Sequence, residues 1–262
     1  MNNVAIAFLT TTPKKETIEF SEKIEAVGFD VFIIYDNEEN VYSDEKLIRI
    51  TDNECINTGY INSNISDSST HIHKNPIAWD KFIYFFCEIK TEYDFIWVFE
   101  DDCFIPSVST IEKLNYNYNK YDLVTPNNFK NLNGNLVDWH WKSIYDKINP
   151  PYAFSMVCAM GLSRNTLNCV KSYKTDKNSL FYIEVMFNTL ALQNNLNTID
   201  PKELKSIVWL GDWGLNEFLL LPNNIFHPRK DIDNFNNLRK EIVKAKLNGV
   251  VPKNNLPHFL KK

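Results

Sequence analysis

An apolar run that ends in three acidic residues constrains this fold more than any other feature of the sequence. Residues 94–99 read DFIWVF, and Glu100, Asp101 and Asp102, the acidic triplet, follow directly. A short run rich in β-branched and aromatic residues predicts a strand that is buried on both faces. Three carboxylates at the end of a buried strand repel one another unless a cation or hydrogen-bond donors compensate them. We therefore expect a buried strand with a ligand site at its carboxyl end.

The acidic triplet indicates a cation site only because of its position in the sequence. Asp and Glu number 33 among 262 residues, so three in a row arise by chance about as often as not. An isolated triplet is typical of a solvated turn. After a buried strand, the hard carboxylate oxygens instead favour Mg²⁺ or Mn²⁺, which bridge protein carboxylates to substrate phosphates.

Strand and helix patterns alternate along the first half of the chain. Apolar runs bounded by turn residues predict strands at 4–9, 31–35, 47–50, 94–99 and 122–124. Helical spacing predicts helices at 14–27, 75–90 and 109–120, the last with a capping box of Ser109 and Glu112. The polar residues 53–73 predict an irregular loop. This order predicts an α/β fold with a mainly parallel central sheet and helices on both faces.

The second half of the chain is less regular. It contains the loop DWHW at 138–141, a strand-like run at 151–160, and helical patterns at 179–196 and 231–247. No internal repeat and no long linker of Pro, Gly or Ser divides the sequence. We therefore expect a single domain over residues 1–262.

Three predicted strands end in polar residues that can bind a ligand. Thr10 and Thr11 follow the first strand, Asp36 follows the second, and the acidic triplet follows the fourth. In open parallel sheets, ligands bind beyond the carboxyl ends of the strands. The three strand ends therefore predict one binding site.

Composition and spacing exclude several other kinds of site. The net charge is −5 and Lys and Arg form no stripe, so we expect no nucleic-acid partner. The 7 Gly form neither G-x-G-x-x-G nor a P-loop, which argues against a glycine-rich phosphate loop. The apolar run at the N-terminus is too short for a signal peptide or a membrane span.

The five cysteines are scattered and never have C-x-x-C spacing. This pattern argues against a zinc site or a disulfide framework and favours reduced thiols in a cytoplasmic protein. We expect all five to be packing residues: Cys55, Cys87, Cys103, Cys158 and Cys169.

Residues 78–107, AWDKFIYFFCEIKTEYDFIWVFEDDCFIPS, resemble the nucleotide-diphospho-sugar glycosyltransferases of the GT-A fold. In that family a helix precedes a hydrophobic strand that ends in a metal-binding D-x-D motif. The acidic triplet is similar to this motif, with Glu100 in place of its first Asp. The likeness is clearest over residues 74–106 and at the N-terminal strand. It implies a nucleotide-sugar-binding half at 1–125 and an acceptor-binding half at 126–262.

The resemblance implies a role for each of the polar strand ends. Asp102 would ligate Mn²⁺ or Mg²⁺, Glu100 is a further candidate ligand, and Asp101 would face the ribose or the sugar of the donor. The nucleoside would be framed by Thr10, Thr11 and Asp36.

Several such transferases carry a His near the C-terminus that completes the metal shell. His227, in the segment HPRKD, is the candidate here, and the alternative is an ordinary His before a proline turn. A neutral imidazole ligand favours manganese over magnesium. Arg229 and Lys230 lie close enough in sequence to reach the diphosphate. Lys74 and Lys81 lie near the start of the helix before the acidic strand. Lys74 could meet phosphate, and the alternative for both is an ordinary helix-surface charge.

Four further carboxylates are candidates for contact with sugars. Asp80, beside that helix start, could bond a sugar hydroxyl, although an ordinary helix-surface charge is the alternative. Glu184 interrupts an apolar helical stretch, where an unpaired carboxylate is costly. Asp138 lies beside aromatic residues in DWHW, and Asp212 lies in GDWG. An inverting transferase needs one such carboxylate as the general base that deprotonates the attacking hydroxyl.

The sequence therefore predicts an enzyme, a hexosyl- or pentosyltransferase that moves a sugar from a UDP- or GDP-sugar to a hydroxyl group of a glycan or protein. One alternative is a metal-dependent nucleotidyltransferase or phosphohydrolase, which the Gly-free first loop in FLTTTPKK disfavours. The other alternative is a non-catalytic domain that binds a nucleotide-sugar.

Overall fold

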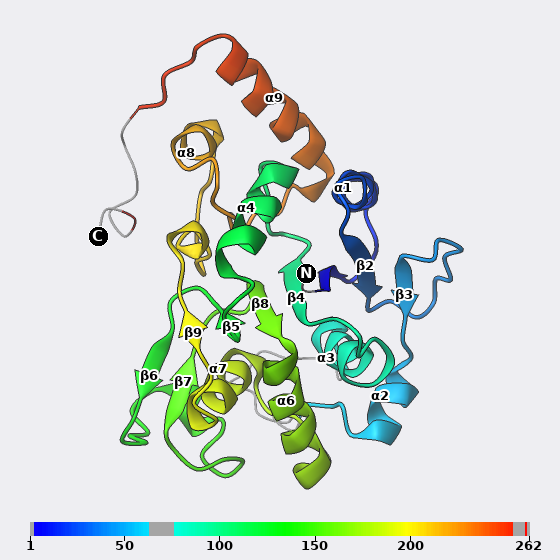
Figure 1. Cartoon of the computed structure of the whole chain (residues 1–262), viewed down its shortest axis with the longest axis vertical. Coiled ribbons are helices and arrows are strands. Elements are labelled where there is room, and N and C mark those ends of the chain that lie inside the picture. Colours follow the sequence, from blue (N-terminus) through cyan, green and yellow to red (C-terminus); the bar gives the residue numbers. More distant parts are fainter. Residues whose placement is uncertain (1–2, 63–75, 254–259, 261–262) are drawn as a thin grey trace.

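A seven-stranded sheet lies at the centre of the computed structural model, which describes residues 3–62, 76–253 and 260 (Figure 1). The strand order is β3-β2-β1-β4-β8-β5-β9. These strands are β1 (Val4–Thr10), β2 (Asp30–Tyr35), β3 (Leu47–Arg49), β4 (Phe95–Glu100), β5 (Leu123–Val124), β8 (Ala159–Ser163) and β9 (Thr198–Ile199). A small second sheet pairs β6 (Phe129–Asn131) with β7 (Tyr152–Phe154).

The central sheet is mostly parallel, which confirms the predicted α/β class. β1 lies between β2 and β4 and runs parallel to both, and β3 extends the parallel edge beyond β2. β8 runs antiparallel to its neighbours β4 and β5, and β9 is parallel to β5. β8 is therefore the antiparallel strand of an otherwise parallel arrangement.

The strand expected at 151–160 is divided between two sheets. β7 ends at Phe154 and β8 begins at Ala159. Between them, the Ser155 N–H donates to the Glu184 carbonyl, and the Ser155 hydroxyl donates to the Pro126 carbonyl. These bonds take the backbone out of strand pairing, and a run of apolar residues gives no sign of them.

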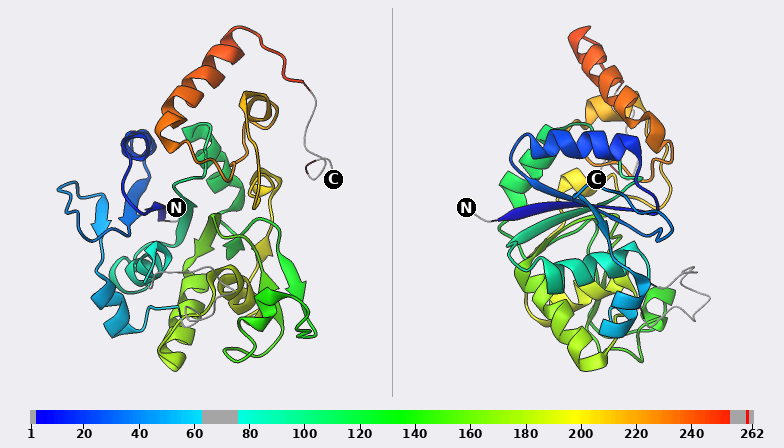
Figure 2. Two further views of the ribbon diagram at one scale, coloured as in Figure 1. Left: turned by 180° about the vertical axis from the view of Figure 1, so that it is seen from behind. Right: turned by 90° about the vertical axis from the view of Figure 1, so that its right-hand side faces the viewer.

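Helices cover both faces of the sheet, as the edge-on view in Figure 2 shows. One face carries α1 (Lys15–Glu25), α4 (Val108–Tyr118), α8 (Leu215–Leu220) and α9 (Phe235–Leu247). The other face carries α2 (Asp52–Thr58), α3 (Ala78–Tyr84), the π-helical turn η2 (Phe85–Ile89), α6 (Arg164–Lys177) and α7 (Ile183–Gln193). Three short segments complete the described helices: α5 (Trp139–Lys142), η3 (Lys202–Leu204) and η4 (Ile232–Asn234).

β4 is buried on both faces, as its apolar sequence predicts. Ile96 and Val98 belong to the core that includes α3 and α7, whereas Trp97 and Phe99 belong to the core that includes α1 and α4. Successive side chains of a strand point to opposite faces, which accounts for this division. The first polar side chain of the strand is therefore Glu100, at its carboxyl end.

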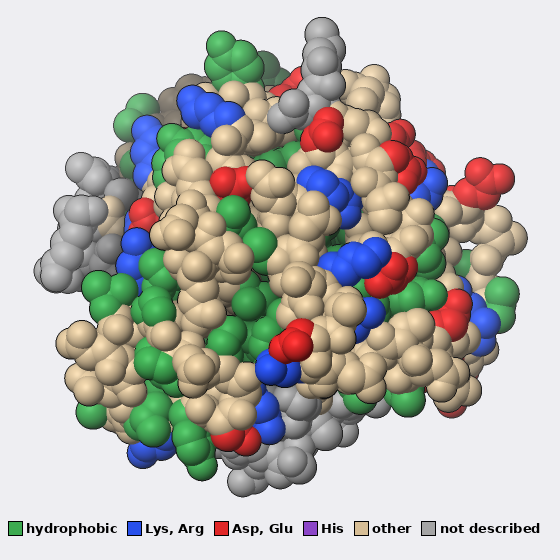
Figure 3. All heavy atoms as spheres, turned by 60° about the horizontal axis from the view of Figure 1, so that its bottom comes forward, with side chains coloured by type: hydrophobic (Ala, Val, Ile, Leu, Met, Phe, Trp, Pro, Cys, Tyr) green, Lys and Arg blue, Asp and Glu red, His purple; other side chains and the backbone are tan. Residues whose placement is uncertain are grey.

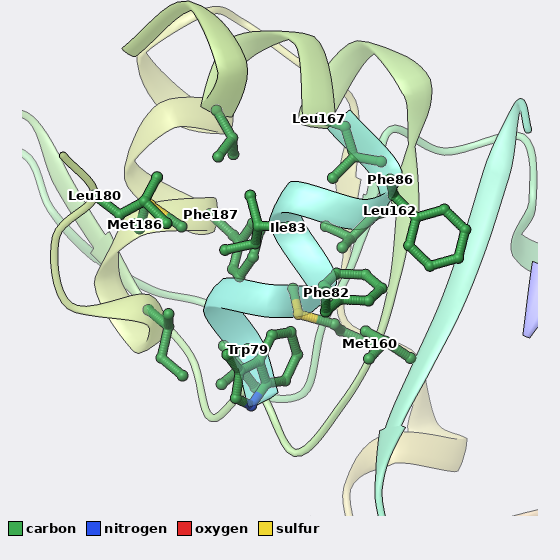
Figure 4. Packing of buried hydrophobic residues seen from close by; sticks show 14 of the residues in the cluster. Trp79, Phe82, Ile83, Phe86, Met160, Leu162, Leu167, Leu180, Met186 and Phe187 are labelled. Atoms are coloured by element: carbon green, nitrogen blue, oxygen red, sulfur yellow. The ribbon is translucent and has the colours of Figure 1, made fainter. Parts of the chain in front are cut away.

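Aromatic packing fixes α3 against the sheet (Figure 4). The rings of Trp79 and Phe82 lie 5.5 Å apart, and the Trp79 ring lies 5.9 Å from Phe187 of α7. Phe86 of η2 lies 5.1 Å from Phe82, and Met160 of β8 belongs to the same cluster. This packing holds the first turn of α3 at the carboxyl edge of the sheet.

Three local predictions differ from the structure. α2 occupies part of the expected loop, because Thr51 and Glu54 form a reciprocal capping box. The Ser109 hydroxyl bonds Ser107, and α4 has no side-chain cap, so the expected box with Glu112 is wrong. α6 was not expected, because its sequence RNTLNCVKSYKTDK is mostly polar.

The distribution of charged side chains and the state of the cysteines can be compared with the sequence. On the face drawn in Figure 3, Lys and Arg side chains are mixed with Asp and Glu, and hydrophobic side chains gather near the middle. All five cysteines are free. Among the helices of the described residues, none is long and apolar enough to cross a membrane.

We expect Phe82→Ala to lower the free energy of unfolding by about 3–5 kcal/mol, because it leaves a cavity in the core beneath α3. Phe82 is 0% exposed, whereas Phe129 is 58% exposed. Phe129→Ala is therefore the matched control and should change stability by about 1 kcal/mol or less. Urea unfolding followed by circular dichroism measures both variants. Equal losses would contradict the placement of α3 in the core.

Candidate functional site

The strand order makes a switch point between β1 and β4. β2 and β3 extend the sheet on one side of β1, whereas β4 lies on its other side. The carboxyl ends of strands that diverge in this way flank a crevice where ligands bind. A cavity of about 290 Å³, the smaller cavity, lies there and is lined by the ends of β1, β2 and β4 and by the start of α3.

The smaller cavity brings together the polar strand ends that the sequence singled out. Thr10, Thr11, Asp36 and the acidic triplet all line it, and Trp79 of α3 forms part of its wall. The predicted convergence of these residues is therefore confirmed. Their role in binding a ligand stays a prediction.

A larger cavity of about 600 Å³ adjoins the smaller one, because Ile77, Trp79, Glu100 and Asp102 line both. The rest of its wall comes from the second half of the chain: Met156, Val157, Cys158, Tyr182, Ile183, Glu184, Trp209, Leu210, His227, Pro228 and Lys230. Glu100 and Asp102 therefore stand at the boundary between two cavities.

Asp101 is tied to β1. Its N–H donates to the Leu9 carbonyl, 2.9 Å away, and its Oδ2 accepts a hydrogen bond from the Thr10 hydroxyl. Burial raises the pKa of Asp101, and the neighbouring charge of Asp102 adds to the rise. Asp101 lines the smaller cavity only, so it can meet a ligand there but not in the larger cavity.

Asp102 lies at the centre of the site and is 7% exposed. Its Oδ2 lies 3.4 Å from His227 Nε2 and pairs with the ammonium of Lys230. Burial alone would raise the pKa of Asp102, but the hydrogen bonds and charges of His227 and Lys230 outweigh burial and lower it. Its other oxygen, Oδ1, is buried without a hydrogen-bond partner among the described residues.

The His227 ring is oriented by the loop before it. Nδ1 lies 3.0 Å from the Val208 carbonyl, to which it can donate, and this bond directs Nε2 toward Asp102. Trp213 donates its indole N–H to the His227 carbonyl at 3.0 Å and holds the backbone. Although burial acts to lower the pKa of His227, the partnership with Asp102 raises it.

Glu100 faces both a tryptophan and a thiol. Trp79 Nε1 donates to Glu100 Oε1 at 2.7 Å, and burial raises the pKa of this carboxyl. The side-chain ligand atoms of Glu100, Cys158 and His227 lie within 4.8 Å of one another. Burial holds the pKa of the Cys158 thiol well above its ordinary value. These three residues, with Asp102 beside His227, form a candidate metal site.

Glu184 lies in the wall of the larger cavity, in the first turn of α7. The Tyr182 hydroxyl donates to Glu184 Oε2 at 2.7 Å. Burial raises the pKa of Glu184 to about 7, and the charge of Glu100 adds to the rise. A carboxyl group with this pKa is matched to proton transfer near neutral pH.

Asp138 bonds His140, and the ring of His140 lies near Glu184. The Asp138 carboxylate caps α5 by accepting the His140 N–H at 3.0 Å, and it also bonds His140 Nδ1. His140 Nε2 lies 4.0 Å from Glu184 Oε2. His140 therefore lies between two of the predicted acceptor-side carboxylates, Asp138 and Glu184. Asp138 itself lines neither cavity.

The remaining candidates lie elsewhere. Asp80 is fully buried and lines neither cavity; its Oδ2 accepts the Ile77 N–H at 2.8 Å, which stabilises the start of α3. The surface position weighed for Asp80 is therefore wrong. Asp212 is exposed and lines neither cavity, and Lys74 lies outside the described residues. Of the basic pair after Pro228, Lys230 lines the larger cavity, and Arg229 instead pairs with Asp231.

Lys81 is buried beside the site, so the helix-surface charge weighed for it is wrong. Its side chain is 0% exposed, and its ammonium lies 2.9 Å from Asp52, 3.3 Å from Glu38 and 3.5 Å from Asp36. It also donates to the Asp36 carbonyl at 3.2 Å. These contacts hold the end of β2 against α3.

The sequence was compared with protein-family models and with curated proteins, and neither comparison finds a match. The residues and the geometry of the site therefore carry the functional argument.

We expect Lys81→Met to lower the free energy of unfolding by about 2 kcal/mol or more, because it leaves three carboxylates without their shared cation. Lys15→Met is the matched control, since the Lys15 side chain is 82% exposed in its pair with Glu19 and such pairs contribute about 0.5 kcal/mol. Thermal unfolding at pH 7 compares the two variants. A Lys81→Met protein as stable as the control would contradict the role given to this ammonium.

Proposed function

We propose that this chain is a metal-dependent glycosyltransferase that moves a sugar from a UDP- or GDP-sugar to a hydroxyl acceptor. One observation carries the proposal: two cavities meet at Glu100 and Asp102. A metal-dependent transferase must bind two substrates side by side and hold its cation at the point where the sugar changes partners. A resemblance of residues 78–107 to GT-A glycosyltransferases points the same way.

The smaller cavity is proposed to bind the nucleotide. It lies at the switch point of the sheet, where nucleotides bind in open α/β folds. Thr10, Thr11 and Asp36 supply polar groups from β1 and β2, and Asp101 supplies a carboxylate from the end of β4. A carboxylate beside the nucleotide can accept hydrogen bonds from ribose or sugar hydroxyls.

The chemistry of the donor set fits a divalent cation of the manganese class. Asp102 Oδ1 is buried without a hydrogen-bond partner among the described residues, so this oxygen has an unused lone pair. His227 Nε2 faces the same carboxylate, and Glu100 lies close to His227. These three residues would hold the ion. When bound, it would offset the negative charge that develops on the departing nucleoside diphosphate.

The larger cavity is proposed to bind the acceptor. Glu184 in its wall would remove the proton from the attacking hydroxyl group. The pKa of about 7 leaves a useful fraction of this carboxyl ionised at neutral pH. Trp209 is 72% exposed and lines the same cavity, so its face is accessible for stacking on a sugar ring.

We expect UDP or GDP with Mn²⁺ to raise the melting temperature by on the order of 5 °C at saturating ligand. Asp102→Asn should abolish this rise, because it removes the charge of the central ligand while keeping its size. Asp176→Asn is the matched control, since the Asp176 side chain is 69% exposed on α6. A full Mn²⁺-dependent rise in Asp102→Asn would refute the proposed site.

The products distinguish the proposal from its two alternatives. With UDP-glucose, UDP-galactose, UDP-N-acetylglucosamine or GDP-mannose, a transferase releases the nucleoside diphosphate and forms a glycoside, with slow donor hydrolysis when no acceptor is present. Release of a nucleoside monophosphate would instead indicate phosphohydrolase or nucleotidyl chemistry. Metal-dependent binding without turnover would indicate a binding domain.

Cys158 favours a second candidate for the cation. Thiolate, imidazole and carboxylate together form a donor set that selects Zn²⁺. The sequence argued against zinc because the cysteines are isolated, but the fold brings one of them to Glu100 and His227. The choice between the two ions depends on whether the thiol loses its proton to the metal.

We expect Cys158 to stay outside the coordination shell, because burial strongly favours the protonated thiol. Co²⁺ replaces either ion, and a thiolate ligand gives it an intense sulfur-to-cobalt absorption band. The wild-type protein with Co²⁺ should lack this band, and Cys158→Ser should leave the affinity for Mn²⁺ within about threefold. A band that disappears in Cys158→Ser would assign the site to Zn²⁺.

A further inference from the structure

We propose that His140, oriented by Asp138, receives the proton that Glu184 takes from the acceptor and passes it to solvent. This inference rests on the proposed transferase function and deepens it, because it assigns a residue that no sequence pattern singled out. The roles differ: Glu184 meets the acceptor, whereas His140 and Asp138 act through Glu184.

The three side chains lie in a row, with one hydrogen bond between Asp138 and His140 and a gap between His140 and Glu184. Asp138 bonds His140 Nδ1, and His140 Nε2 lies 4.0 Å from Glu184 Oε2. Because Nδ1–H donates to the carboxylate, the neutral ring presents the lone pair of Nε2 toward Glu184. A shift of the Glu184 carboxylate by about 1 Å would bring the pair within hydrogen-bond distance.

The imidazole is held in this orientation by its surroundings. Its ring centroid lies 3.9 Å from that of Trp139 and 3.9 Å from that of Phe154 on β7. Asp138 is fixed in turn as the cap of α5. Burial would raise the pKa of Asp138, but its hydrogen bonds to the backbone and ring of His140 outweigh burial and lower it. The carboxylate is therefore charged and can stabilise an imidazolium.

Among the described residues, the titratable groups around Glu184 make His140 the acceptor best placed for its proton. Tyr182 donates to Glu184 and so is not an acceptor, and Glu100 and His227 lie on the side of the candidate metal site. On the other side lies His140, whose side chain is 14% exposed against 15% for Glu184, and the Asp138 side chain beyond it is 47% exposed. The imidazole therefore keeps contact with water, to which it can release a proton.

The step balances without any further reactant. The acceptor O–H bond breaks, its proton goes to the Glu184 carboxylate, and the oxygen forms a bond to the anomeric carbon of the donor. The bond from that carbon to the diphosphate breaks, and its electron pair leaves with the nucleoside diphosphate. Glu184 then gives its proton to His140 Nε2, and the imidazolium releases this Nε2 proton to water, so the neutral ring keeps its Nδ1–H toward Asp138. Glu184 is thereby returned to its basic form for the next turnover.

His140→Gln tests the relay, because glutamine can still bond Asp138 but cannot carry a proton at neutral pH. Asp138→Asn is a second variant, on a side chain that is 47% exposed, should the first fail to fold. Lys142→Gln is the matched control, a basic residue on the exposed side of the same helix α5. Turnover of UDP-glucose, UDP-galactose, UDP-N-acetylglucosamine and GDP-mannose is measured with Mn²⁺ and methyl glycoside acceptors, with and without added imidazole.

We expect kcat to fall at least tenfold in His140→Gln and in Asp138→Asn, with KM for the donor unchanged. Added imidazole should restore turnover in His140→Gln but not in Glu184→Gln, which lacks the base. Lys142→Gln should keep the wild-type kcat.

Two results would overturn the relay while the proposed function stands: wild-type kcat in His140→Gln, or a loss that imidazole does not restore and that comes with weaker UDP binding. A wild-type protein that transfers no sugar from any of the four donors would refute the proposed function itself, and the relay with it.

Discussion

The repulsion among three carboxylates at the end of β4 is the constraint on which the rest of the site depends. β4 is buried on both faces, so solvent cannot screen the triplet from within the sheet. Each member is instead compensated by a donor from another element: the Trp79 indole for Glu100, the Thr10 hydroxyl for Asp101, and the His227 ring with Lys230 for Asp102. α3, β1 and the segment after α8 each supply such a donor, so all three meet at one strand end.

His227 is far from Asp102 in the sequence. Backbone hydrogen bonds hold its segment at the carboxyl end of β4. Phe104 and Phe226 pair as an isolated antiparallel bridge, and the Arg229 N–H donates to the Asp102 carbonyl at 2.9 Å. Phe104, Phe226 and Trp213 then pack in a separate hydrophobic cluster with α8 and α9. The backbone that carries the imidazole is thus fixed by a core of its own, and the ring then meets the Asp102 carboxylate.

Prediction from the sequence succeeded where local pattern decides the structure. The apolar runs gave β1, β2 and β4, and the parallel order placed Thr10, Asp36 and the triplet at one edge. Contacts between segments distant in the sequence could not be predicted in this way. Cys158 lies in an apolar run that resembles any buried strand, and nothing local marks its approach to Glu100 and His227. The sequence around Lys81 likewise does not distinguish it from a surface charge. Only the fold brings Asp36, Glu38 and Asp52 to its ammonium.

The turn at the end of β4 separates the members of the triplet by position. β4 ends at Glu100, and the Cys103 N–H donates to the Glu100 carbonyl at 3.0 Å, which places Asp101 and Asp102 in a turn. Glu100 and Asp102 line both cavities, whereas Asp101 lines only the smaller one. A cation held by Glu100 and Asp102 would therefore stand between two substrates, and Asp101 would contact only the nucleotide. Glu184 lines the larger cavity together with both of these carboxylates. Glu100 and Asp102 thus stand between the two cavities, and their carboxylates supply the negative charge where the cavities meet.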